Sequence, residues 1–593
     1  MHTYALDYET YYDKRCSIRT LGPRGYFSHP DFDAYMVSVV GDDGTKFCGH
    51  PKDFDWNLLI GNRVLSHNAS FDQALYLFGV EQNWWPSVEF AEWHCTADMV
   101  SFLGLPRSLK NASAVALGIE LDKSTRDNMS GKSWESMPED FKKEVIEYAL
   151  KDSEYCLELW QRLSDQWPER ERKISTTNRA VVMGGIPIDQ ELLSQSIAKI
   201  NKTLFDTENL IPWIDDKPIL SRIAFNEECN KVGLEPPESL AMDDTDANEF
   251  LDTNGEKYPW IGAVRNYRRI NALKRKLESF DKATMDDGRY YGGLMYFGAH
   301  TGRFSGSGGN LNLQNLPRGE MFGVDLRSLI AAPEGRKLLA VDLSQIEVRT
   351  LCWLAGDKET MDEIAKSDDI YEAFAVRFGL WEREKGSLKK VDPKLRHAVK
   401  AMVLGCGYGC GAKKFSTIAN ITHDESLEAV GLYRKKMTKV VDLWKSYNDD
   451  LWACTNPQLS GPNFKHEMEI PLPSGRVLKY GNISLRQKDE RTEYTAFMLK
   501  HSKKIPVRLY GGLLAENASQ ALARDIFCDM LCRIHDAGLK IIFHVHDEVV
   551  LEVPEESAEL DLQRVIEIMS SPPEWIPDIP LAAEGTILSH YTK

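Results

Sequence analysis

The stretch LLAVDLSQIEVRTL, residues 338–351, decides the fold together with two later segments, RHAVKAMVLGCGYG at 396–409 and IIFHVHDEVVLEV at 541–553. The first and third segments each carry an aspartate, Asp342 or Asp547, at or near the end of an apolar run that is typical of a buried strand. Strand ends hold side chains rigidly, which a pair of metal ions about 3.5–4 Å apart requires. We therefore expect these two carboxylates to form one metal site.

The middle segment is basic. Arg396, Lys400, Leu404 and Tyr408 recur every four residues, so they share one broad face of a helix. Cations beside metal-bound carboxylates neutralise a triphosphate and the charge that develops on its leaving group. The order acidic, basic, acidic therefore predicts the transfer of a nucleotidyl group.

Each of these features also has an ordinary structural explanation. A single aspartate such as Asp342, placed after a strand, is more often a helix cap. A cationic helix face is usually solvated. The polar cluster at 546–548 interrupts an apolar run, and burying it is costly unless it binds something. A tight turn between two paired strands would expose that cluster instead, and this alternative stays open.

A second set of acids lies near the N-terminus. Asp7 and Glu9 are two residues apart on an expected strand, so both side chains leave the same face, although a solvent-exposed strand gives the same pattern. Asp72 follows in HNASFD, and Tyr148 and Asp152 lie four apart on one face of an expected helix. Four carboxylates can hold two metal ions that activate a water molecule.

The three C-terminal segments resemble motifs A, B and C of family A DNA polymerases, the class of bacterial DNA polymerase I, from about residue 183 to the C-terminus. The resemblance implies that Asp342 and Asp547 bind two Mg²⁺ ions, for which Mn²⁺ can substitute. It implies that dNTP is bound by Arg396 and Lys400 at the phosphates, by Tyr408 and Leu404 near the base pair, by Glu347 at the ribose and by Tyr371. The DNA contacts that it implies are Arg303, Asn312, Gln314, Asn315, Gln520 and His546.

Three positions depart from the family pattern. Leu404 replaces the aromatic residue that is usual on the nucleotide-binding helix. Tyr371 stands where many members carry a phosphate-contacting histidine, and its hydroxyl could take over that contact without a positive charge. His397 occupies a position that is often arginine. We expect an active enzyme whose nucleotide-binding region differs from the usual type.

The N-terminal segments DYET, NASFD and YALKD resemble the three motifs of proofreading 3′–5′ exonucleases. This resemblance implies that Asp7, Glu9, Asp72 and Asp152 hold two further Mg²⁺ ions and that Tyr148 helps to orient the attacking water. We therefore expect an α/β multidomain chain in which a ribonuclease H-like exonuclease domain precedes a right-hand polymerase. The expected ranges are 1–165 for the exonuclease and 166–593 for the polymerase, with the thumb at about 190–285, the palm at about 286–350 and 476–593, and the fingers at about 351–475. Within the palm, residues 286–320 are expected to form a loop.

The composition fits a globular chain that works on DNA. The 593 residues are 42% hydrophobic and carry a formal net charge of −17, which argues against a protein that coats DNA with its whole surface but not against a local basic groove. The sequence shows neither an apolar run of membrane-spanning length nor a secretory signal, so we expect no membrane partner. The 11 cysteines have no framework pattern, and Cys406 and Cys410 lack the second pair that a zinc site needs. We expect reduced thiols and a cytoplasmic location.

The expected partners are primer-template DNA and dNTPs, while a helicase, a single-strand-binding protein or a clamp remains open. A compact chain with both activities resembles bacteriophage replicative polymerases, which predicts a role in viral DNA replication in the host cytoplasm. Two alternatives stand beside this reading: a replisome component whose catalysis is weakened, and a single-subunit RNA polymerase. Glu347 and the exonuclease-like segment argue against the second.

Overall fold

The computed structural model of the chain describes residues 1–120, 124–241, 244–307, 312–456, 466–488, 491–500 and 503–592. Its N-terminal part is a mixed five-stranded sheet in the order β3-β2-β1-β4-β5, in which β1 pairs antiparallel with β2 and parallel with β4. The strands are β1 (Thr3–Glu9), β2 (Met36–Gly41), β3 (Lys46–Gly49), β4 (Arg63–Ser66) and β5 (Glu92–Cys95). The helices around them are α1 (Ile18–Phe27), α2 (Ala69–Glu81), α3 (Thr96–Phe102), α4 (Leu109–Leu117), α5 (Ser124–Met129) and α6 (Glu139–Leu163).

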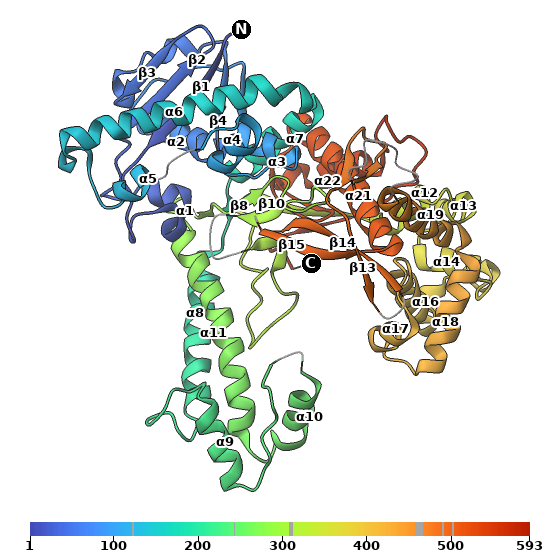
Figure 1. Cartoon of the computed structure of the whole chain (residues 1–593). Coiled ribbons are helices and arrows are strands. Elements are labelled where there is room, and N and C mark those ends of the chain that lie inside the picture. Colours follow the sequence, from blue (N-terminus) through green and yellow to red (C-terminus); the bar gives the residue numbers. More distant parts are fainter. Residues whose placement is uncertain are drawn as a thin grey trace.

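Helix α6 lies across this sheet, as Figure 1 shows. Its buried face carries small and apolar side chains, including Val145, Ala149 and Ser153, which let it approach the sheet closely. The hydroxyl of Ser38 on β2 donates a 2.8 Å hydrogen bond to the Ala149 carbonyl, and this bond fixes the position of the helix over the strand. The other side chains of this face are thereby held against β1.

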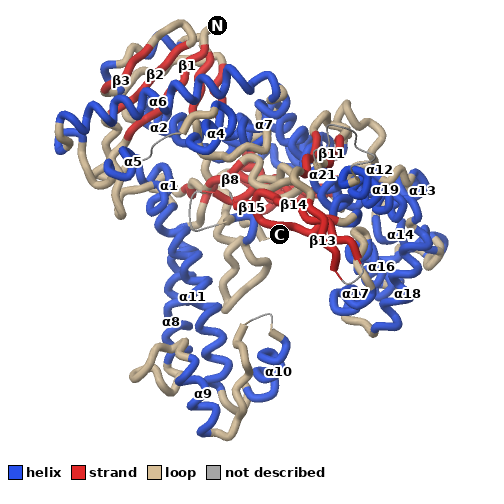
Figure 2. The backbone as a smooth tube through the Cα atoms, in the orientation of Figure 1, coloured by secondary structure: helices blue, strands red, loops and turns tan. Residues whose placement is uncertain are grey.

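Two long antiparallel helices form a projection (Figures 1 and 2). Helices α8 (Gln190–Glu208) and α11 (Pro259–Ala283) bury Ile200 against Ile270 and Leu273, which is the helical packing that their apolar spacing predicts. Helices α9 (Arg222–Lys231) and α10 (Thr245–Asn254) lie toward the far end of α11, where Trp213 and Phe225 pack on Trp260 in a separate small core.

The C-terminal part is built on a four-stranded sheet in the order β16-β17-β10-β18, in which each strand is antiparallel to its neighbours. These strands are β10 (Arg336–Leu343), β16 (Ile541–Val545), β17 (Glu548–Pro554) and β18 (Ala583–Leu588). Around them lie α12 (Ile346–Leu354), α21 (Gly511–Asp536) and α22 (Ala558–Ser570). Further strands of the chain are β6 (Ile186–Pro187), β11 (Met468–Pro471), β12 (Val477–Tyr480), β13 (Ser484–Lys488), β14 (Arg491–Lys500) and β15 (Lys503–Leu509).

A helical group follows α12 and packs around Phe374, Val399 and Tyr433. It consists of α13 (Lys358–Ala365), α14 (Ile370–Phe378), α15 (Leu388–Val391), α16 (Pro393–Cys406), α17 (Ala412–Ala419), α18 (His423–Lys436) and α19 (Thr438–Thr455). Among the helices that the structure describes, none has the length and apolar character that a membrane crossing requires.

The expectation of a loop at 286–320 was wrong in part. The segment contains the short strands β7 (Arg289–Tyr290), β8 (Gly293–Met295) and β9 (Ser305–Ser307), and β8 pairs with β9. Strands of two or three residues are too short to show the alternation from which a strand is predicted. Residues 308–311 of the same segment lie outside the described residues.

Helix α7 (Glu169–Met183) joins the N-terminal and C-terminal parts through buried polar contacts. On the N-terminal side, Arg179 donates to the Gln73 side chain (2.5 Å) and to the Trp93 carbonyl, and Ser175 donates to Asp98 (2.6 Å). Both Arg179 and Asp98 are buried. The expected boundary after residue 165 therefore leads into a packed helix rather than an exposed linker.

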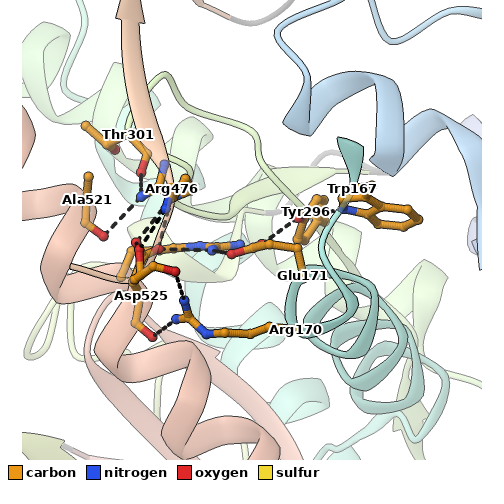
Figure 3. A network of polar contacts seen from close by, with 10 residues as sticks. Trp167, Arg170, Glu171, Tyr296, Thr301, Arg476, Ala521 and Asp525 are labelled. Atoms are coloured by element: carbon orange, nitrogen blue, oxygen red, sulfur yellow. Dashed lines mark hydrogen bonds and ion pairs between the residues drawn. The ribbon is translucent and has the colours of Figure 1, made fainter. Parts of the chain in front are cut away.

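On its other side α7 enters the ionic network of Figure 3. Arg524 on α21 donates to Glu171 (2.7 Å) and to Asp525 (3.2 Å), and Arg476 donates to Asp525 (3.0 Å). Glu171, Arg524 and Asp525 are 2%, 3% and 0% exposed. Burial alone would raise the pKa values of Glu171 and Asp525. The neighbouring guanidinium groups outweigh this effect and hold both pKa values below their usual range. Both acids thus stay charged inside the protein.

Replacing Arg524 by alanine should destabilise the protein strongly. The change removes the guanidinium that pairs with the buried Glu171, while Asp525 keeps Arg476, and for the uncompensated charge of Glu171 we expect a loss of about 3–5 kcal/mol. Lys445→Ala is the control, because Lys445 pairs with Asp442 on the surface of α19, where the two side chains are 68% and 63% exposed, and such a pair contributes about 1 kcal/mol or less. Calorimetry should show a much larger drop in the unfolding midpoint for Arg524→Ala. Equal drops in the two variants would contradict a structural role for the network.

Candidate active sites

The five N-terminal candidates come together in one cavity of about 680 Å³. Asp7 and Glu9 enter it from β1, Asp72 from the first turn of α2, and Tyr148 and Asp152 from α6. The Asp72 carboxylate also accepts a 3.3 Å hydrogen bond from the backbone N–H of Tyr8, which ties α2 to β1. The packing of α6 across β1 therefore brings Asp152 into the same cavity as Asp7, although the two residues lie 145 positions apart in the chain.

The carboxylates of this cavity repel one another. Burial raises the pKa of Asp7 well above its usual range, and the charges of Glu9, Asp72 and Asp152 raise it further. Burial, with Asp152 beside it, raises the pKa of Glu9 to about 8, and burial raises that of Asp72 to about 7. Oxygen donors that oppose each other's ionisation are the donor set that Mg²⁺ or Mn²⁺ stabilises.

Four cations that line this cavity are not among the residues expected from the sequence: Arg19, Arg107, Lys110 and Arg126. Arg126 on α5 opposes the rise in the pKa values of Asp7 and Glu9 without reversing it. Its only sequence signal is an arginine in a polar segment, which is a common surface pattern. Among the described residues, no group of three or more His, Cys, Asp or Glu side chains stands ready to hold a metal ion, so the four acids would have to move closer together around one.

The C-terminal aspartates are brought together by strand register. In the antiparallel pair of β10 and β17, Asp342 lies opposite Glu548, which follows Asp547 directly. Asp547 sits in the tight turn between β16 and β17, where His546 has a left-handed backbone (φ 55°), and the Leu343 N–H donates to the Asp547 carbonyl (3.2 Å). The tight-turn geometry is therefore present, and it places the acid beside Asp342 at the edge of the sheet.

The surroundings of Asp547 are charged. Burial raises the pKa of Asp547 to about 6, and the Asp342 carboxylate adds to the rise, while Arg303 opposes it. Arg303 forms an ion pair with Glu347 on α12. Burial raises the pKa of Tyr408, and Glu347 raises it further, so Tyr408 lies within electrostatic reach of the same group. The expected metal ligands Asp342 and Asp547 thus share one region with three other expected site residues. These are Arg303, an expected DNA contact, and Glu347 and Tyr408, expected nucleotide contacts.

Arg396 is held by a carboxylate in this structure. Its Nε and Nη2 donate to the two oxygens of Asp369, at 2.5 Å and 3.1 Å, and Asp369 also caps the N-terminus of α14. The Arg396 guanidinium and the Lys400 ammonium lie 5.0 Å and 5.8 Å from the centre of the Tyr371 ring. One edge of the guanidinium is thereby fixed, and the edge that carries Nη1 is left for another ligand.

Tyr371 is 3% exposed, and its buried hydroxyl has no hydrogen-bond partner among the described residues. The expected contact between this hydroxyl and a phosphate stays a prediction. The ring forms a platform beneath the two cations. The sequence could not show this, because a tyrosine on a helix gives no sign of which way its hydroxyl points.

Lys400, Leu404 and Tyr408 share a second hollow, of about 510 Å³, between α16, α17 and the start of α21. Leu404 is 47% exposed there. Lys414 and Glu516 also line the hollow and were not found from the sequence, because they reach it from other helices. The cationic helix face therefore borders a cavity instead of being solvated along its whole length.

Three other DNA candidates lie in or beside a short helical turn, and a fourth lies on α21. Asn312 begins the short helical turn Leu313–Asn315 by accepting a 3.0 Å hydrogen bond from the Gln314 N–H, and Asn312 and Asn315 are exposed. Gln520 on α21 donates to Glu516 (3.3 Å). No DNA is present, so their contacts with it stay predictions.

Comparison with known proteins adds independent findings. A family model described as DNA polymerase family A matches residues 219–593. A DNA polymerase of Bacillus phage SP02 is 27% identical to this chain over the full length of both. The thermostable DNA polymerase I of Thermus aquaticus is 25% identical over 69% of this chain and 47% of its own, so the chain spans about half the length of that relative.

Among solved structures, the POL domain of Pol1 from M. smegmatis, in a complex with DNA primer-template and dNTP, covers 100% of this chain. The match covers 95% of that chain, with a TM-score of 0.70 and 19% sequence identity. At this identity the likeness establishes a shared fold.

The acid cavity predicts a pH-dependent response to Mg²⁺. Because the folded state holds protons on Glu9 and Asp72 up to a higher pH than the unfolded chain does, metal-free stability should fall as the pH rises from about 4 toward 8. Mg²⁺ should raise the unfolding midpoint more at pH 8.5 than at pH 6, since only ionised carboxylates bind it.

Asp7→Asn should raise the metal-free midpoint at pH 8 by a few degrees and reduce the shift caused by Mg²⁺, because it removes one of the repelling charges. Asp140→Asn, at an exposed acid on the same helix as Asp152, is the matched control and should change neither value. An equal Mg²⁺ shift in all three proteins would rule out this cavity as a metal site.

Proposed function

The chain belongs to DNA polymerase family A, and from this premise we propose that Asp342 and Asp547 form its site of nucleotidyl transfer. The observation that supports the proposal is the register of β10 against β17, in which Asp342 lies opposite Glu548, the residue that directly follows Asp547. The reaction joins the primer 3′-OH to the α-phosphate of a dNTP and releases pyrophosphate.

The two aspartates would hold Mg²⁺, and their oxygen donors and mutual repulsion fit that ion. When bound there, Mg²⁺ supplies the charge that activates the 3′-OH and neutralises the leaving group. Arg396 and Lys400 bind the triphosphate, and Asp369 keeps the guanidinium of Arg396 turned so that its free edge faces the ligand. Glu347 excludes the 2′-OH of a ribonucleotide.

DNA and base contacts complete this proposal. Tyr408 and Leu404 line the hollow that borders the new base pair, so an alkyl chain stands where relatives usually place a ring. The strand that is copied and the growing primer are held by Arg303, Asn312, Gln314, Asn315, Gln520 and His546. Much of this grip is to phosphates and is therefore weakened by salt.

We further propose that the cavity of Asp7, Glu9, Asp72 and Asp152 is a 3′–5′ exonuclease site that removes misincorporated nucleotides. Its support is the meeting of four carboxylates and Tyr148 in one cavity, on a mixed sheet of the kind expected for a ribonuclease H-like domain. The carboxylates would hold Mg²⁺ or Mn²⁺. Tyr148, whose pKa is raised by burial and by Asp152, stays protonated and can donate a hydrogen bond to the attacking water.

The proposed domains follow the architecture. Residues 1–165 form the exonuclease, and the α8–α11 projection supports a thumb at about 190–285. The helical group supports fingers at about 351–475, and the four-stranded sheet supports a palm at about 286–350 and 476–593. The full-length match to a phage enzyme supports replication of viral DNA in the host cytoplasm.

A primer-template incubated with Mg²⁺ tests both activities. With dNTPs the primer should lengthen, and without them it should shorten. Asp342→Asn should abolish lengthening and leave shortening, while Asp7→Asn should do the reverse, because each variant removes a ligand from one site only. DNA binding with neither activity in the unaltered protein would favour a weakened replisome component, and extension by rNTPs as fast as by dNTPs would favour an RNA polymerase.

Tyr371 offers a sharper test of the phosphate site. Tyr371→Ala should raise the KM for dNTP about two- to fivefold, because it removes a cation–π platform that contributes about 0.5–1 kcal/mol. Tyr371→Phe is the matched control, and its KM should stay within about twofold, because the lost hydroxyl has no partner. Steady-state primer extension measures both values. A large rise in KM for Tyr371→Phe would show that the hydroxyl itself binds the nucleotide.

A further inference from the structure

A third hollow, of about 470 Å³, lies between α1 and the C-terminal half of α11. Figure 1 shows α1 seated where the N-terminal part meets the α8–α11 projection. Gly22 interrupts α1 with a left-handed backbone (φ 71°), and a Cβ built on it would lie 3.9 Å from the Tyr291 carbonyl and 4.0 Å from the Cβ of Ala283. The two walls of the hollow are therefore held close together.

This α1–α11 groove is strongly cationic. Its walls carry Arg19 from α1 and Arg275, Lys276 and Lys282 from α11, against the single carboxylate of Glu278. Glu278 lies 4.0 Å from Lys274, so it is already shared with another cation. Within the described part of the chain, none of the four cations of the groove makes a side-chain hydrogen bond or an ion pair. Although the chain has a net charge of −17, these four unpaired cations give the groove a local positive charge that attracts an anionic ligand.

The groove adjoins the acid cavity, because Arg19 lines both hollows. This junction distinguishes the groove from an ordinary solvated helix face. The four carboxylates of the acid cavity repel a polyanion, so cations near its entrance favour the binding of a nucleic acid whose end enters it. Arg19 and Lys282, one on each wall, are placed to supply that attraction.

We propose that the α1–α11 groove binds the phosphates of single-stranded DNA and guides its 3′ end to the acid cavity. We take a single strand as the ligand, because the groove adjoins the cavity in which the proposed reaction removes nucleotides from a 3′ end. The inference rests on the exonuclease proposed above, and it adds a binding site that contains none of the proposed catalytic residues.

The test is the salt dependence of binding. Arg19→Gln/Lys282→Gln removes one cation from each wall, and Lys202→Gln/Lys435→Gln removes the same charge from exposed positions on α8 and α18. Fluorescence anisotropy with a labelled single-stranded oligonucleotide in EDTA measures binding without hydrolysis. Two lost phosphate contacts should reduce the slope of log K against log salt by about 1.4, at about 0.7 for each contact. The control variant should keep the slope of the unaltered protein.

Hydrolysis then separates this proposal from the exonuclease itself. With Mg²⁺, the groove variant should degrade the oligonucleotide more slowly relative to the p-nitrophenyl ester of thymidine 5′-monophosphate, which is too short to reach the groove. If the unaltered protein hydrolysed neither substrate, the proposed exonuclease activity would be contradicted. The binding measurement in EDTA would still test whether the groove binds DNA. Equal salt slopes for the groove variant and the control would contradict DNA binding by the groove, whatever the hydrolysis showed.

Discussion

The antiparallel register of β10 against β17 is the constraint on which the C-terminal site depends. A shift of one residue would turn Asp342 to the opposite face of the sheet and away from Asp547. The register is held by apolar side chains such as Leu339, Val341 and Val549, which are fully buried between the sheet and its helices. Ordinary core packing therefore determines the distance between two charged groups at the sheet edge.

Electrostatic repulsion is a shared property of both sites. In the N-terminal cavity the carboxylates raise one another's pKa values, and at the sheet edge Asp342 does the same to Asp547. Such clusters are costly for the isolated protein, and divalent cations relieve that cost. The surrounding cations, Arg126 at one site and Arg303 at the other, offset part of the repulsion without neutralising it.

Much of the fold could be predicted from the sequence wherever the signal was local. The strands that end at Asp342 and near Asp547 and the helix that carries Arg396 were predicted and are confirmed, because apolar runs and four-residue spacing report short-range structure. The family assignment is also confirmed. The short strands within residues 286–320 are not predictable in this way, because two or three residues leave no alternating pattern.

The partners of the site residues could not be predicted in the same way. Arg126, Lys414 and Glu516 reach the cavities only through tertiary packing, and no spacing in the chain links them to the acids or to α16. The same holds for Asp369, which lies 27 residues from Arg396 in sequence yet grips its guanidinium with both oxygens. Burial of the Tyr371 hydroxyl likewise follows from the packing of several helices.

Helix α7 gives the molecule a further property. Its Ser175 and Arg179 are bonded into the N-terminal part, and its Glu171 is bonded to Arg524 in the C-terminal part. One helix therefore supplies essential partners to two cores, and it belongs to neither alone. An exchange of modules with a distant relative at this point would have to carry α7 together with its partners on both sides, so the two halves of the chain are expected to evolve as one inherited unit.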